Sequence, residues 1–165
     1  MAMTRPALVQ LVTPVLAGAA VLSCGGGHSA SKGSAEAPVV GPPQVAWKAM
    51  KKNQKAKYME KVVVPHMEPL FQAFDGKKFA TFNCETCHGG GAEDGTYELP
   101  NPDIFALPTT PEGFGKLMAD KGEWMKFMGG QVKPEMAKLL GLEEFEPKAP
   151  KPDTFSCGAC HTSAK

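Results

Sequence analysis

The chain has 165 residues and a formal net charge of +1, so its charge gives no electrostatic reason to bind nucleic acid. Glycine (18 residues) and proline (15 residues) are too frequent for a large, regular core. A chain of this length is expected to fold as one domain. One so rich in loops usually needs disulfides, a metal or a cofactor to hold it together, which directs attention to its five cysteines.

Residues 1–23 have the pattern of an export signal, in which Arg5 precedes an apolar stretch over 6–22. The sequence Val-Leu-Ser-Cys that ends at Cys24 resembles the lipobox of bacterial lipoproteins, where the cysteine is acylated. The alternative is an ordinary signal peptide cleaved elsewhere. We expect a lipoprotein at the periplasmic face, held at a membrane by its acyl chains without spanning it. Because Gly25 rather than aspartate follows Cys24, the outer membrane is favoured over the inner one.

Residues 24–45 are rich in glycine, serine, alanine and proline, and they carry only two charged side chains. Such a segment cannot bury enough apolar surface to fold, so we expect a flexible tether. Its root-mean-square reach is roughly 25 Å. The globular domain is predicted over 46–165.

This domain repeats its own pattern at an offset of 69 residues. An aromatic residue followed by methionine ends at Met59 and again at Met128, and a Pro-x-Met sequence ends at Met67 and again at Met136. Apolar residues in each block recur at helical spacing, and a Cys-x-x-Cys-His motif follows each block. We therefore expect a mainly α fold, built as two helix–turn–CxxCH pseudo-repeats over about 46–90 and 114–165.

Two local features are expected to interrupt the helices. Pro65 and Pro134 should kink or restart them, and should push Val64 and Lys133 toward extended geometry. The long segment 89–113 has no regular period and is predicted to be a loop. A loop of this length is usually functional or packs over something, and its side chains at Tyr97, Phe105 and Leu107 are expected to lie against the face or edge of any cofactor that the cysteine motifs hold.

Four cysteines form the two motifs, which comprise Cys84, Cys87 and His88 in the first and Cys157, Cys160 and His161 in the second. Two thiols about one helical turn apart can form thioethers with the two vinyl groups of a porphyrin, and the imidazole that follows can bind its iron. We therefore expect two covalently attached haem c groups, with four cysteines as attachment points and both histidines as axial ligands. Covalent attachment suits a compartment outside the cytoplasm, in agreement with the export signal.

Two other uses of the cysteines stay open. A redox disulfide is expected in a strand–helix–strand setting, which the sequence does not show. A zinc site would use the four cysteines with or without the histidines. The separation of 70 residues between Cys87 and Cys157 is long for a compact zinc site, and zinc gives no reason for histidine to follow both motifs.

The other axial position of each iron needs a second ligand, usually methionine or histidine. We predict Met67 and Met136, which lie two residues after the prolines and nearer their cysteines. Met59 and Met128 are the alternates, and His66 is a third candidate for one iron. All four methionines also suit an apolar core.

In its order of elements the chain resembles the tetrahaem cytochrome subunit of photosynthetic reaction centres, over residues 57–88 and 126–161. In that family a helix supplies the axial methionine, a turn follows, and CxxCH binds the same haem. The resemblance implies helices packed around two haems with long loops. It also implies electron transfer outside the cytoplasmic membrane, often from a lipid anchor.

The sequence thus predicts an electron carrier rather than an enzyme. Its partners would be redox proteins, either other cytochromes or membrane electron-transfer complexes. The alternative is a small dihaem enzyme of peroxidase type with one open iron, for which His66, Glu98 and Glu135 are the candidate acid–base residues. A zinc- or thiol-binding surface lipoprotein is the third possibility.

Overall fold

The structure is a computed structural model, and it describes residues 41–164. The predicted export signal, the lipidation site at Cys24 and most of the predicted tether lie outside these residues. Within them the chain is mainly helical, as predicted, and it forms three isolated parallel bridges but no strand.

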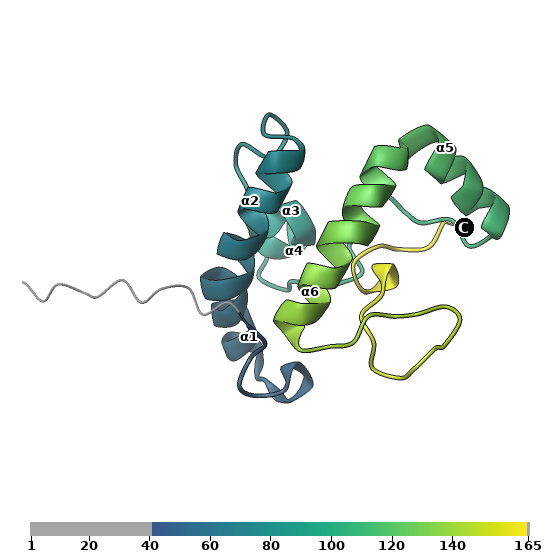
Figure 1. Cartoon of the computed structure of the whole chain (residues 1–165). Coiled ribbons are helices and arrows are strands. Elements are labelled where there is room, and N and C mark those ends of the chain that lie inside the picture. The colour runs from purple at the N-terminus through teal and green to yellow at the C-terminus, as the bar shows by residue number, and fades with distance from the viewer. Residues whose placement is uncertain (1–40, 165) are drawn as a thin grey trace, which may run out of the picture. The chain divides into compact units, whose positions relative to one another are not determined.

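Most of the helical residues lie in two long stretches (Figure 1). One stretch joins α1, η2 and α2 without a break, and the other joins α5, η3 and α6. The segments η2 and η3 are π-helical, whereas η1 and η4 are short 3-10 helices. The helical segments are η1 (Trp47–Ala49), α1 (Lys52–Tyr58), η2 (Met59–Val63), α2 (Val64–Phe74), α3 (Cys84–His88), α4 (Gly90–Glu93), α5 (Pro111–Phe127), η3 (Met128–Val132), α6 (Lys133–Leu140) and η4 (Cys157–Ala159).

The prolines at 65 and 134 restart the α-helices as predicted, but the residues before them do not have the predicted geometry. Val64 (φ −59°, ψ −52°) and Lys133 (φ −60°, ψ −51°) both have right-handed helical backbones, so the prediction of extended geometry is wrong. The amide of each donates to the carbonyl five residues earlier, which is the hydrogen bond of a π-helix. The wider turn makes room for the proline ring, which would otherwise crowd the carbonyl four residues back. Each α-helix then restarts with proline in its first turn.

The larger core cluster centres on Phe71 of α2. Its ring centroid lies 4.9 Å from that of Phe79, 4.9 Å from that of Phe82 and 5.1 Å from that of Phe127. Aromatic pairs of this kind contribute about 1 kcal/mol each beyond the apolar area they bury. Because Phe79 and Phe82 lead directly into α3, the cluster fixes the first cysteine motif against the end of α5.

A second, smaller cluster holds the second motif against α6. Ala137 and Leu140 on α6 are buried with Phe155, and Cys160 packs against this group. The amide of Phe155 donates to the carbonyl of Glu143 at 2.7 Å, which ties the segment before the motif to the turn after α6.

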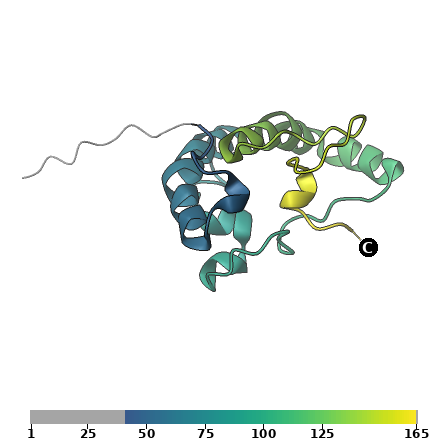
Figure 2. The same ribbon diagram turned by 90° about the horizontal axis from the view of Figure 1, so that it is seen from below.

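The segment between α4 and α5 crosses to the C-terminal segment (Figure 2). Parallel bridges pair Asn101 with His161 and Leu107 with Ser163. The amide of Leu107 donates to the carbonyl of Thr162 at 2.8 Å. The loop that follows the first motif is therefore paired along the second.

Candidate functional site

The first motif forms a short, capped helix, α3. The side chain of Asn83 accepts a hydrogen bond from the amide of Glu85 at 2.9 Å, and the amide of Asn83 donates to the hydroxyl of Thr86 at 3.1 Å. Residues three apart on a helix share a face, so the thiols of Cys84 and Cys87 lie on one side of α3. Both cysteines are free thiols.

The second motif forms a shorter turn of a different helical type, without a side-chain cap. Residues Cys157–Ala159 form the 3-10 helix η4, and the amide of His161 donates to the carbonyl of Cys157 at 3.0 Å. Because of this turn, the thiols of Cys157 and Cys160 are about one helical turn apart. Cys157 and Cys160 are also free, so the structure uses none of the four motif cysteines in a disulfide.

The two imidazoles differ in their hydrogen bonding. Nδ1 of His161 lies 2.8 Å from the carbonyl oxygen of Phe105. Because a carbonyl only accepts, Nδ1 donates this hydrogen bond, and the neutral tautomer that does so has its lone pair on Nε2, the atom that can bind a metal.

Nδ1 of His88, in contrast, is buried and has no hydrogen-bond partner among the described residues. Its ring meets that of Tyr97 edge to face, with 5.5 Å between centroids. Burial lowers the pKa of His88, and the nearby backbone of Tyr97 offsets this only in part. The imidazole is thus held in its neutral, ligating form, although nothing in the described residues uses it.

Asn101 brings the two motifs together. Its side-chain amide donates to the carbonyl of Cys87 at 2.9 Å, and its backbone amide donates to the carbonyl of Cys160 at 2.8 Å. The proximity of the motifs also affects the thiols. Burial raises the pKa of Cys87 to about 12, with further contributions from Cys160 and Cys84. Burial raises the pKa of Cys160 to about 11, with a contribution from Cys157.

Each motif has candidate methionines in the core around it. Met67 is buried in the cluster that Cys87 packs against, and Met128 borders the same cluster. Met136 and Met59 are half-buried beside the cluster that includes Cys160. The choice of Met67 and Met136 as axial ligands stays a prediction.

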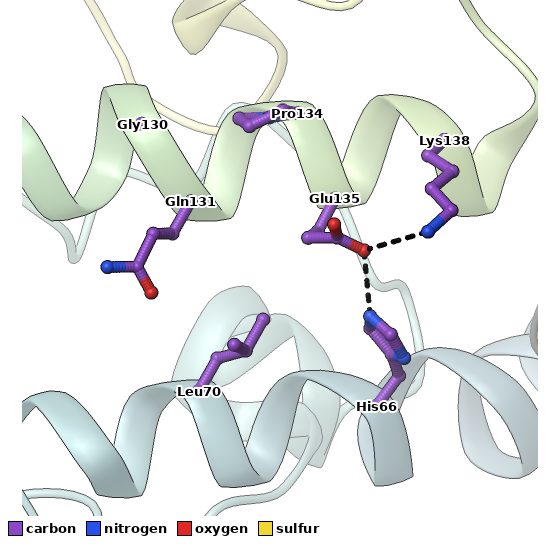
Figure 3. A pocket seen from close by; sticks show the side chains of 7 residues that line it. All are labelled: His66, Leu70, Gly130, Gln131, Pro134, Glu135 and Lys138. Carbon is purple, nitrogen blue, oxygen red and sulfur yellow. Dashed lines mark hydrogen bonds and ion pairs between the residues drawn. The ribbon is translucent and has the colours of Figure 1, made fainter.

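His66, the third candidate ligand, has another partner. Its Nε2 lies 2.9 Å from a carboxylate oxygen of Glu135 on the facing helix α6, and Lys138 lies 3.7 Å from the same oxygen (Figure 3). Leu70 and Pro134 line the same shallow pocket. Of the three residues considered for acid–base chemistry, the structure therefore pairs His66 with Glu135, whereas Glu98 lies in the exposed loop.

No protein family, curated protein or solved structure matches the chain. Within residues 41–164, no three histidine, cysteine, aspartate or glutamate side chains gather in the manner of a metal site. None of the helices described is long and apolar enough to cross a membrane.

The sequence did not single out two residues that shape this site. Asn101 lies in the unpatterned loop, and its partners are 14 and 59 residues away along the chain. Gly89 follows His88 directly, and its φ of +53° and ψ of −139° suit glycine alone. If glycine followed the histidine of both motifs, the repeat would have indicated this turn. The residue after His161 is Thr162, so the sequence gives no such indication.

Proposed function

We propose that the chain is an exported, lipid-anchored cytochrome c that carries two covalently attached haems and transfers electrons. In this proposal the two pseudo-repeats enclose the haems, Cys24 carries the lipid, and the protein acts at the periplasmic face of the outer membrane. Its partners would be other cytochromes or membrane electron-transfer complexes.

The observation that carries the proposal is the twin geometry of the motifs. In each, two free thiols lie one helical turn apart, and a histidine follows directly. Cys84 and Cys87 would hold one haem and Cys157 and Cys160 the other. His88 and His161 would each present Nε2 to an iron. When bound, haem supplies a one-electron iron couple.

The remaining polar groups fit this use. His161 already has its Nδ1 proton fixed by Phe105, and such a bond orients a ligating imidazole and raises its basicity. His88 is half-buried, and its buried Nδ1 has no hydrogen-bond partner among residues 41–164, which a protein seldom retains without a purpose. The buried apolar clusters that surround Cys87 and Cys160 would exclude water from the haem faces.

The thiols themselves argue against a redox disulfide. Reactive cysteines have a lowered pKa, because the thiolate is the nucleophile. Here the pKa values of Cys87 and Cys160 are raised to about 12 and about 11, so both stay protonated near neutral pH. Neither Cys87 nor Cys160 therefore has the lowered pKa of a reactive cysteine.

The test is the alkaline pyridine spectrum of protein exported from a host with a cytochrome c maturation apparatus. We expect the bands of haem with both vinyl groups saturated, and a haem-to-protein ratio of two. A matched variant, Cys84→Ala with Cys87→Ala, should retain one haem. Absence of c-type haem from the wild-type protein would overturn the proposal.

The same preparation separates a carrier from an enzyme. If each iron has a methionine as its second protein ligand, as predicted for Met67 and Met136, the reduced protein should not bind carbon monoxide readily. Ready binding at one iron, together with turnover of peroxide, would show that an enzymatic function replaces the one proposed.

A further inference from the structure

One side chain, that of Asn101, joins the two cysteine motifs. Its Nδ2 donates to the carbonyl of Cys87, and its backbone amide donates to the carbonyl of Cys160. Among residues 41–164, no other residue hydrogen-bonds to the backbone of a cysteine in both motifs. The carbonyl oxygens of the two cysteines are therefore within about 10 Å of each other, which is as far as one asparagine with two hydrogen bonds can span.

The surroundings hold Asn101 in one conformation. Its side chain is almost fully buried, with 1% exposed, so its polar atoms have no access to water. Its Oδ1 accepts a hydrogen bond from the amide of Asp103 at 2.8 Å, and Asp103 in turn accepts one from the amide of Gly90 at 3.3 Å. The backbone amide, Nδ2 and Oδ1 of Asn101 thus each make one hydrogen bond within the site. Removal of such a buried, hydrogen-bonded side chain is costly, because its partners lose their hydrogen bonds.

The backbone at Gly89 also packs closely against the side chains of Asn101 and Asp103. A β-carbon on Gly89 would lie 3.0 Å from Nδ2 of Asn101 and 2.5 Å from a carboxylate oxygen of Asp103. The turn after the first motif thus packs directly on the Asn101–Asp103 turn. The parallel bridge between Asn101 and His161 aligns the other side of this turn with the second motif.

We propose that Asn101 is a positioning residue that fixes the separation and orientation of the two haem-attachment motifs. The inference rests on the proposed function and goes beyond it, because it assigns the geometry between the two haems to a single amide. Each motif packs against a buried apolar cluster of its own, around Phe71 and around Leu140, and Met59 and Met136 border both clusters. Loss of the amide should therefore leave both attachment sites intact and loosen only their mutual placement. Electron exchange between two haems falls steeply with their separation, so this placement bears directly on function.

The test measures haem–haem coupling in the loaded protein. Circular dichroism in the Soret band gives a bisignate couplet when two haems are close and fixed relative to each other. We expect such a couplet in the wild-type protein, and loss of most of its amplitude in Asn101→Ala. Intact mass and the alkaline pyridine spectrum should still report two haems in the variant. The matched control is Asn53→Ala, since Asn53 is exposed on α1 and should leave the couplet unchanged.

A second variant distinguishes the hydrogen bond that Asn101 donates to Cys87 from the one that it accepts from Asp103. Asn101→Asp keeps an oxygen for the amide of Asp103 but, ionised at pH 9, offers no donor to the carbonyl of Cys87. We expect it to lose the couplet as Asn101→Ala does. An undiminished couplet in Asn101→Asp would overturn the bridging role, and an undiminished couplet in Asn101→Ala would overturn the inference as a whole.

Two results in the wild-type protein bear on the proposals separately. Two haems without a couplet would overturn the inference alone, because the haems would then not be fixed close together. A mass equal to that of the polypeptide, without haem, would overturn the proposed function from which the inference starts.

Discussion

Replacement of Gly89 by alanine tests the packing of the first motif against the crossing loop. Gly89 has a φ of +53°, and a β-carbon there would lie 2.5 Å from Asp103 and 3.0 Å from Asn101. The backbone conformation alone should cost about 1–2 kcal/mol in a residue with a β-carbon. Displacement of Asp103 and Asn101 breaks at least one buried hydrogen bond, which adds about 1–3 kcal/mol. We therefore expect Gly89→Ala to lower the free energy of unfolding by about 3 kcal/mol.

Two other glycines provide matched controls. Gly95 also has a positive φ, of +73°, but a β-carbon there would meet nothing within 4 Å. Gly95→Ala should therefore cost only the backbone strain, about 1 kcal/mol. Gly115 in α5 has neither strain nor a close neighbour, so Gly115→Ala should stabilise the protein by about 0.5–1 kcal/mol.

The assay is guanidinium unfolding of the haem-loaded protein, followed by far-ultraviolet circular dichroism. The difference between Gly89→Ala and Gly95→Ala reports the contact with the Asn101–Asp103 turn, together with any difference in backbone strain between the two positions. If the two variants were equally destabilised, the close packing of this turn on the first motif would be refuted.

The hydroxyl of Tyr58 lies 2.6 Å from the carbonyl oxygen of Leu139 and 2.5 Å from that of Gly41, and it shares its one hydrogen between them, so Tyr58→Phe should cost about 1 kcal/mol in guanidinium unfolding. Burial raises the pKa of Tyr58 above 10.0, so stability should be constant below pH 10.0 and fall as the pH rises through the native value, because the unfolded chain ionises first. In Tyr58→Phe this part of the alkaline loss should be absent, and its persistence there would contradict the assignment. Met67→Leu and Met136→Leu keep most of the packing volume but remove the thioether, so each should abolish the optical signature of methionine ligation at one haem and lower its reduction potential. The controls Met59→Leu and Met128→Leu should leave both haems unchanged. Loss of the methionine signature in these two variants instead would show that Met59 and Met128 are the axial ligands.

The helices before each cysteine motif could be predicted because their apolar residues recur at helical spacing. The π-helical turns at η2 and η3 could not, since the choice between bonds to the fourth and fifth preceding carbonyl depends on how the whole helix packs. Local steric rules for the residue before proline gave the wrong geometry at Val64 and Lys133 for this reason. The two turns nevertheless occupy equivalent places 69 residues apart, where the sequence pattern repeats.

The cysteine motifs were fully visible in the sequence, because their chemistry depends on adjacent residues. The contacts between them were not visible. Tyr97 and Phe105 were expected near the haems from the length of the loop alone, and the structure brings their loop to His88 and His161. The role of Asn101 depends on the path of the loop, which no local pattern specifies. Its hydrogen bonds join segments that are far apart along the chain and become neighbours only after folding.

Intact mass spectrometry of the purified, exported protein tests the central claim most directly. We expect the mass of the acylated polypeptide that begins at Cys24, plus two haems that remain bound under denaturing conditions. Changing Cys157 and Cys160 to alanine should remove the mass of one haem and leave the other. A wild-type mass equal to that of the polypeptide with its lipid alone would contradict the account.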